Sequence, residues 1–367
     1  MERAPTSRGR RVASAAVAAF FAALVAAIVV FAVRSYQTQE ELRPKPPRIE
    51  QLEPGSEEEA FWKQIYKRRP VFTEVERSCY VDATKFKMRT GDRKQDNAFG
   101  GVATDMMKIA LSPPDKRPAA PRIDRQNFDL LLGTCPTCGA TYMDLDIINI
   151  NTGRPPGAPA KLKQFKLAEM LPELAAEPQA NWTFDERSLA HYITQRHAGF
   201  PALELGYSAL SGAYSGNLSI RLGRKYKLTP AAFYALAAAE FSAALESKDY
   251  DNAQAGSLIA MTRGEMYRLL GRRDAASVSF ELARELGGLD EKTETILAHL
   301  EGLNGKEDFT LQRQPLEGEL RPPLGWYIDT LLAGANAELD VQRGKWGALD
   351  DPQAIVAQMR VELATQR

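Results

Sequence analysis

The sequence predicts a mainly α-helical protein with three parts: a single N-terminal transmembrane helix, a small α+β module that carries cysteines, and a C-terminal helical domain. Three observations predict this fold class. An uncharged apolar run extends from Val12 to Val33, two short cysteine motifs follow it, and helical patterning dominates beyond residue 160. An apolar run of this length makes a helix of about 33 Å, which is enough to cross a hydrocarbon core of about 30 Å.

Basic residues before the apolar run set its expected orientation. They are Arg3, Arg8, Arg10 and Arg11. The positive-inside rule then predicts that residues 1–11 are cytoplasmic, that residues 12–33 span the inner (cytoplasmic) membrane, and that the remainder is extracytoplasmic, in the periplasm. A cleaved signal peptide is the alternative, because Ala-rich apolar stretches also serve as signal sequences. The end of this run, however, offers no small-x-small cleavage site.

Within the predicted membrane helix, small residues recur at every fourth position. They are Ala15, Ala19, Ala23 and Ala27. Such a stripe lets helix backbones approach closely in lipid, so it is a candidate surface for a partner helix. Ala-rich composition without any such role is the alternative. Residues 34–55 are rich in proline and charge, which predicts a stiff linker between the membrane and the folded part.

Charge and motif content argue against several function classes. Lys plus Arg and Asp plus Glu are equal at 47 each, so no basic field favours nucleic acid. The sequence has no Gly-rich phosphate loop, no Gly-x-Ser-x-Gly elbow and no His-Glu-x-x-His helix, and it indicates no small-molecule substrate. We interpret the three histidines, His191, His197 and His299, as surface or cap residues. The sequence therefore predicts a protein that is not an enzyme.

The module at residues 56–155 contains two candidate knuckles. Cys135-Pro-Thr-Cys138-Gly has the sequence of a zinc knuckle, and Cys79-Tyr-Val-Asp82 has the same spacing with aspartate in the last position. Together they offer Cys79, Asp82, Cys135 and Cys138 as ligands for a structural zinc ion. A Cys135–Cys138 disulfide, a metal-free knuckle and a redox-active pair are the alternatives. Strands are expected at 71–75 and 142–150, and a helix at 97–111.

Residues 160–367 show helix signals throughout. Thr183 and Glu186 fit a capping box, and Thr229-Pro230 fits the start of a long buried helix. The segment 264–284 resembles a tetratricopeptide repeat, in which small and aromatic residues pack two antiparallel helices; here they are Gly264, Tyr267, Ala276, Phe280 and Ala283, with Gly271 at the turn. Such a hairpin is either core scaffold or one wall of a ligand-holding groove.

The C-terminal segment carries two aromatic residues directly after a proline pair. Trp326 and Tyr327 begin a helical pattern that we expect to close the helical domain as a cap. Aromatic side chains dominate interface hot spots, so these two are candidates for partner binding. Packing of both side chains into the core is the alternative.

The two knuckles and the C-terminal helical hairpin together resemble a family of uncharacterised bacterial proteins. Members of this kind generally carry two full Cys-x-x-Cys knuckles, whereas Asp82 replaces one cysteine here. The expected function is that of a membrane-anchored extracytoplasmic interaction or assembly subunit, whose tetratricopeptide-like surface faces protein partners in a membrane-associated complex. A redox or zinc-handling protein that uses Cys79, Cys135 and Cys138 is the alternative.

Overall fold

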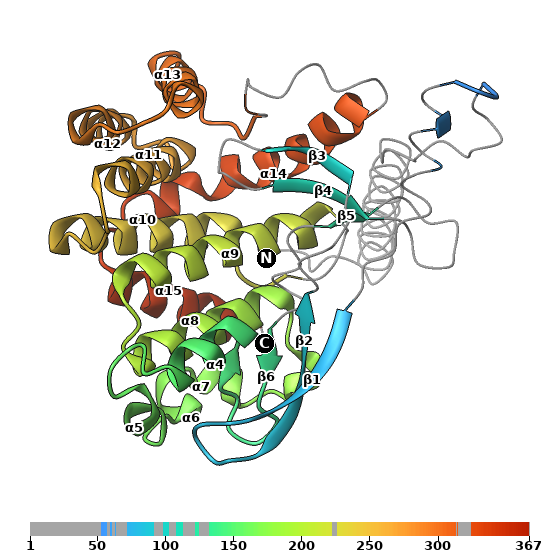
Figure 1. Cartoon of the computed structure of the whole chain (residues 1–367), viewed down its shortest axis with the longest axis vertical. Helices are drawn as coiled ribbons and strands as arrows, with labels where there is room; N and C mark the ends of the chain where they lie inside the picture. Colours follow the sequence, from blue (N-terminus) through green and yellow to red (C-terminus); the bar gives the residue numbers. More distant parts are fainter. Residues whose placement is uncertain are drawn as a thin grey trace, which may run out of the picture. The chain divides into compact units, whose positions relative to one another are not determined.

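The computed structural model describes residues 53–56, 59–60, 63, 72–91, 98–102, 108–112, 122–124, 132–221, 226–312, 314 and 324–366 (Figure 1). The strands in this part of the chain are short and antiparallel. They are β1 (Phe72–Ser78), β2 (Lys85–Gly91), β3 (Ala98–Val102), β4 (Lys108–Ser112), β5 (Arg122–Asp124), β6 (Gly133–Thr134) and β7 (Thr141–Tyr142). They form a β1–β2 hairpin, a β3–β4–β5 sheet and a β6–β7 pair, in which Gly133 lies opposite Tyr142.

Helices make up most of the described chain, which confirms the mainly α-helical prediction. In order they are α4 (Asp144–Asn151), α5 (Ala158–Leu162), α6 (Leu167–Met170), α7 (Pro172–Ala175), the 3₁₀ turn η2 (Gln179–Asn181), α8 (Phe184–Ala198), α9 (Ala202–Arg221), α10 (Pro230–Ser247), α11 (Ala253–Leu269), α12 (Arg273–Leu286), α13 (Glu291–Gly305), α14 (Leu324–Trp346) and α15 (Pro352–Thr365). Among these helices, none is both long enough and apolar enough to cross a bilayer. The predicted anchor at residues 12–33, with Ala15, Ala19, Ala23 and Ala27, lies outside the described residues and stays a prediction.

Two helix starts are as the sequence predicts. The Thr183 hydroxyl accepts a hydrogen bond from the Glu186 N–H at 3.4 Å, and the Glu186 carboxylate accepts one from the Thr183 N–H at 2.7 Å. The backbone N–H groups of Thr183 and Glu186, which have no partner within the helix, thereby each have a hydrogen-bond acceptor. Helix α10 begins at Pro230 after Thr229, and its residues from Pro230 to Phe241 are all buried. This helix is the central one of the helical part, with α9, α11, α14 and α15 packed against it.

Two elements differ from the expectation. Within the predicted helix at 97–111, the described residues form strands β3 (Ala98–Val102) and β4 (from Lys108) instead. Gly100 and Gly101 fall in this segment, and each costs about 1 kcal/mol in a helix. The strand expected at 142–150 ends at Tyr142 and is followed by α4, although its Ile-rich sequence favours a strand. Asp146 decides this, because its carboxylate accepts a hydrogen bond from the Met143 N–H at 2.6 Å and caps the helix.

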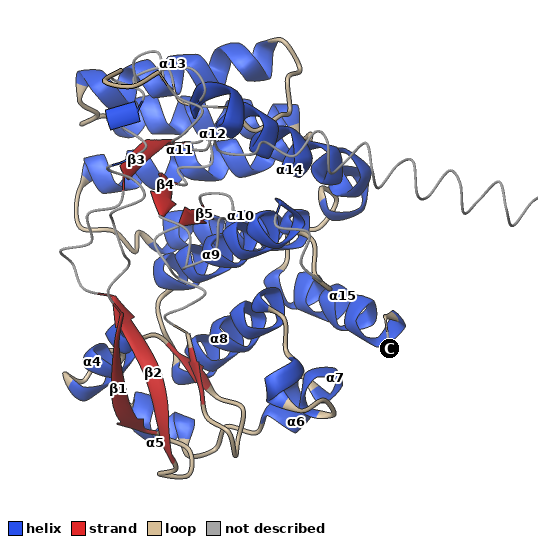
Figure 2. Cartoon of the chain, turned by 90° about the vertical axis from the view of Figure 1, so that its right-hand side faces the viewer, coloured by secondary structure: helices blue, strands red, loops and turns tan. Residues whose placement is uncertain are grey.

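The knuckle segment and the helical segment share one buried core. The residues of this core run from Cys79 through Tyr142 to Leu363 without a break between the two segments. Strand β7 and helix α5 pack on α8, and β6 packs beside β2. Figure 2 shows the β1–β2 hairpin beside α4, and the two are joined by an ion pair between Arg77 and Asp144 at 2.7 Å. The described residues of 56–155 and 160–367 therefore share this core.

The C-terminal helices do not cap the end of the helical stack as expected. Helix α14 packs against α9 and α10, and α15 packs against α10 and α7, so both fold back across the middle of the helical part. Leu332 and Leu339 on α14 are buried. The side chains of Trp326 and Tyr327 lie outside the described residues, so their role in partner binding stays a prediction.

Candidate metal centre

The two knuckles have the same backbone geometry. In the first, the Cys79 N–H donates to the Thr84 carbonyl at 2.9 Å, and the Ala83 N–H donates to the Cys79 carbonyl at 3.0 Å. In the second, the Cys135 N–H donates to the Ala140 carbonyl at 2.8 Å, and the Gly139 N–H donates to the Cys135 carbonyl at 3.0 Å. This match places Asp82 where the second knuckle has Cys138.

A left-handed residue closes each turn. Gly139 has a φ of 76°, and Ala83 has a φ of 60° at the corresponding position of the first knuckle. Glycine adopts this conformation without steric cost, whereas alanine does so rarely. Gly139 has a second reason to be glycine, because a Cβ there would lie 2.5 Å from Cδ2 of Leu167. The first knuckle thus keeps the geometry of the second although it lacks both the second cysteine and the glycine.

The ligand atoms of Cys79, Asp82, Cys135 and Cys138 all lie within 4.8 Å of one another. The Sγ atoms of Cys79 and Cys138 are 3.5 Å apart, and Cys135 Sγ lies 3.6 and 3.7 Å from the two carboxylate oxygens of Asp82. A tetrahedral ion with bonds of about 2.3 Å to sulfur keeps its ligand atoms about 3.8 Å apart. The donor set and its spacing therefore fit one tetrahedral ion held by three thiolates and a carboxylate.

The pKa values of the four side chains in the cluster shift in different directions. The contact with Cys138, acting against burial, lowers the pKa of Cys79 to about 6, and the same contact with burial raises the pKa of Cys138. Burial raises the pKa of Cys135. Burial also raises the pKa of Asp82, but the hydrogen bonds that it accepts from Thr84 and from the cysteines outweigh burial, so this pKa lies below its usual value.

Access to the cluster differs among its members. Cys79 is 3% exposed and Cys135 is fully buried, whereas Cys138 is partly exposed and Asp82 lies at the surface. The Tyr142 hydroxyl lies 3.6 Å from Cys79 Sγ, and the Val81 N–H donates to the same sulfur at 3.4 Å. Hydrogen bonds to sulfur of this kind orient thiolate ligands around a metal. Tyr142 and Val81 are supporting residues that sequence reasoning missed, since no spacing rule links them to the cysteines.

A buried polar chain connects the knuckle module to the helices. Asp146 accepts hydrogen bonds from His191 at 2.7 Å and from Gln195 at 2.8 Å, and the other ring nitrogen of His191 lies 2.9 Å from the Ser208 hydroxyl. His191 is only 2% exposed, so its interpretation as a surface or cap residue is wrong. Asp146 lies on α4 with its side chain buried in the core.

The Asp146–His191–Ser208 chain has the residue types of a hydrolytic triad, but substrate in solution cannot reach it. All three side chains are buried at 3% exposure or less. A nucleophilic serine has to reach substrate, and Ser208 does not reach the surface. These bonds hold α4, α8 and α9 together.

The helical hairpin has the close packing that its sequence predicts. Gly271 has a φ of 73° at the turn between α11 and α12, and Ala276, Phe280 and Ala283 are buried. A Cβ at Gly264 would lie 2.4 Å from the ring of Phe280, so only glycine lets α11 approach α12 this closely. Helix α13 completes the small core on this side.

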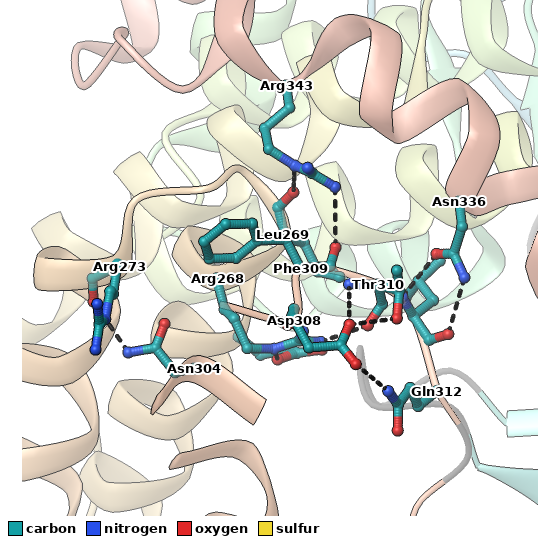
Figure 3. Close-up of polar contacts among 12 residues, drawn as sticks. Arg268, Leu269, Arg273, Asn304, Asp308, Phe309, Thr310, Gln312, Asn336 and Arg343 are labelled. Atoms are coloured by element: carbon teal, nitrogen blue, oxygen red, sulfur yellow. Dashed lines mark hydrogen bonds and ion pairs between the residues drawn. The ribbon is translucent and has the colours of Figure 1, made fainter. Parts of the chain in front are cut away.

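One face of this hairpin is occupied by the chain's own residues 308–312 (Figure 3). Arg268 donates hydrogen bonds to the backbone carbonyls of Asp308 and Thr310, the latter at 2.8 Å. Asn336 on α14 bonds both backbone groups of Leu311, at 2.6 Å to its N–H and at 3.1 Å to its carbonyl. The segment therefore lies between α11 and α14 in the manner of a bound extended peptide and occupies this face of the hairpin.

The sequence was compared with protein-family models, with curated proteins and with solved structures. No family model matches it, and no curated protein or solved structure is significantly similar to it.

Proposed function

We propose that this chain is a non-catalytic interaction or assembly subunit whose Cys79, Asp82, Cys135 and Cys138 cluster holds one structural zinc ion. The observation that carries the proposal is the pair of matching knuckles, which brings four ligand atoms within 4.8 Å. Zinc is the ion that tetrahedral sites rich in thiolate hold most often in proteins. The ion would fasten the β1–β2 hairpin, through Cys79 and Asp82, to the β6–β7 pair and hence to α8.

The closed ligand set supports a structural role. Catalytic zinc sites keep one position for water or substrate, whereas structural sites take all four ligands from the protein. Here the protein supplies four ligand atoms, and the two inner cysteines are buried. The buried chain through His191 supports the same conclusion, because it ties the module to the helices without reaching solvent.

The interaction role rests on what surrounds the site. The predicted anchor at residues 12–33 would hold the folded part at a membrane, and the tetratricopeptide-like helices would present their surface to a protein partner. Residues 308–312 fill the face between α11 and α14. The partner surface that we propose therefore includes the outer face of α12, where Val278 is 61% exposed.

A redox or zinc-handling role is the second candidate. The observation that favours it is the 3.5 Å contact between Cys79 and Cys138, one of which is partly exposed. In that role the metal or the thiols would be exchanged during function, whereas in the structural role they would stay in place.

Zinc content of the full chain, purified in mild detergent under reducing conditions, tests the proposal. We expect about one zinc per chain by mass spectrometry of metals, with the zinc lost in Cys138→Ser. Thr137→Ser is the matched control, because it changes the same turn but keeps the backbone and the hydroxyl, which lies 3.1 Å from the Thr84 hydroxyl. Zinc-free wild-type protein that unfolds at the same temperature with and without added zinc would refute the structural site.

A deletion tests the division between anchor and folded part. Residues 48–367 form one compact unit, so removal of residues 1–36 should leave a folded protein that no longer sediments with membranes. Aggregation of this fragment would contradict that division. Chemical cross-linking of the full chain in membranes, repeated with Val278→Lys, would then test the outer face of α12: the cross-linked species should be lost in the variant.

A further inference from the structure

We infer that Cys138 is a thiol–disulfide exchange site and that Cys79 resolves it, so that oxidation replaces the metal by a disulfide between the two knuckles. The inference rests on the proposed function, because it concerns the same four-residue cluster. The inference adds Cys138 as a modification site and the Cys79–Cys138 disulfide as a pairing, and it describes how the cluster reacts with an oxidant.

Geometry selects this pair among the three thiols. Cys79 Sγ and Cys138 Sγ are 3.5 Å apart and face each other across the knuckles. A disulfide needs the sulfurs about 2.0 Å apart, so a movement of about 1.5 Å closes the bond. The Cys135 thiol instead donates to the Asp82 carboxylate, at 3.6 Å to one oxygen and at 3.7 Å to the other.

Exposure selects the residue that reacts first. Cys138 is the one cysteine of the cluster that is partly exposed, whereas Cys79 and Cys135 are buried. It also lies in an exposed turn, next to Pro136 and Thr137. A small disulfide from solution therefore reaches Cys138 before the other two, and reaction rates in thiol–disulfide exchange depend on such access.

The chemistry balances with a low-molecular-weight disulfide as the oxidant. The Cys138 thiol passes its proton to the Cys79 thiolate 3.5 Å away and attacks one sulfur of that disulfide, whose S–S bond breaks. The thiolate released in this step takes the proton back from Cys79. The Cys79 thiolate then attacks Cys138 Sγ, which forms the Cys79–Cys138 bond and releases the second thiolate. The two cysteines give up two electrons and two protons, and the oxidant takes them up as two thiols.

The product removes two of the four metal ligands and keeps the knuckles joined. Cys135 and Asp82 alone are a poor zinc site, so the ion leaves. The new bond links positions 59 residues apart, between the first turn and the second. The β1–β2 hairpin thus stays fastened to the β6–β7 pair, by the metal in the reduced protein and by the disulfide in the oxidised one.

Peptide mapping distinguishes the possible pairings. The full chain in detergent is treated with oxidised glutathione, blocked with an alkylating reagent and digested without reduction. Trypsin separates Cys79 from the other two cysteines, because it cleaves at Lys85 and Arg125. A Cys79–Cys138 bond gives two cross-linked peptides, with the alkyl label on Cys135 located by fragmentation. A Cys135–Cys138 bond gives a single looped peptide.

We expect the cross-linked product to form in the wild type and in Cys135→Ser, and zinc to be released in step with it. In Cys79→Ser, the glutathione adduct should accumulate on Cys138. A looped Cys135–Cys138 peptide as the main product, or an adduct mainly on Cys79 or Cys135, would overturn the inference. Zinc measured before oxidation keeps the two proposals apart, because a chain without zinc can still show this pairing, and a zinc-loaded chain can fail to show it.

Discussion

Replacing Gly264 by alanine should loosen the α11–α12 hairpin. A Cβ at this position would lie 2.4 Å from Cε1 and 2.6 Å from Cδ1 of Phe280. Carbon atoms that pack well are about 3.5–4.0 Å apart, so the ring has to move by about 1 Å or more. Phe280 is buried within the small core that α11, α12 and α13 form, and this leaves the ring little room.

Two opposing contributions set the size of the effect. Overpacking of a well-packed core costs about 1–3 kcal/mol. Alanine is favoured over glycine inside a helix by about 0.5–1 kcal/mol, which offsets part of that cost. The net loss of stability should therefore be up to about 2.5 kcal/mol. Gly302 on α13 is the matched control, because a Cβ there meets no atom within 4 Å. Its replacement should stabilise the protein by about 0.5–1 kcal/mol.

Chemical unfolding followed by far-ultraviolet circular dichroism measures both variants. The difference between Gly264→Ala and Gly302→Ala isolates the overpacking cost, because the helix-propensity gain is common to both. Phe280→Leu in the Gly264→Ala background should recover part of the loss, since the smaller side chain vacates the space. If Gly264→Ala proves as stable as Gly302→Ala, the close approach of α11 and α12 is not what the glycine permits.

Three further outcomes follow from the structure. Asp82→Cys completes a four-cysteine site in an unchanged turn and should raise the affinity for zinc, measured by competition with a chelator. In the wild type and in the variant, this affinity should fall as the pH falls, because protons compete with zinc for the thiolates. Arg268→Ala should cost about 3–5 kcal/mol of unfolding free energy because it leaves the fully buried Glu265 without its ion pair, whereas Arg284→Ala, in an exposed pair, should cost less than about 1 kcal/mol. Burial raises the pKa of Asp185 to about 6, so the folded state favours the protonated carboxyl. The stability that this group contributes is present below about pH 4 and is lost as the pH rises through about 6, a loss of about 3 kcal/mol between pH 4 and 7. Asp185→Asn should abolish this loss, and urea titrations at the two pH values would measure it.

Local signals in the sequence account for the parts of the fold that were predicted correctly. The Thr183 and Glu186 capping box joins residues three positions apart, and helix α10 begins at Pro230, directly after Thr229. The α11–α12 hairpin follows in the same way from Gly264, Gly271 and the small residues around them. In each case the partners are close in the sequence, so spacing alone identifies them.

Long-range contacts account for the parts that were missed. The segment after Tyr142 is helical because Asp146 caps it and then bonds His191 and Gln195 on α8, and neither partner is visible from the local pattern. His191 is buried for the same reason. The return of α14 and α15 across α10 depends on packing between surfaces that are far apart in the chain.

The sequence by itself determined the residue types of the candidate metal site and the spacing within each knuckle. Only the tertiary structure decided that the two knuckles come together, with Cys79 against Cys138 and Cys135 against Asp82. The physical reason is that a ligand set is a property of distances between atoms. Residues within one turn fix those distances by backbone geometry, whereas two turns far apart in the chain are brought together only by the core that packs around them.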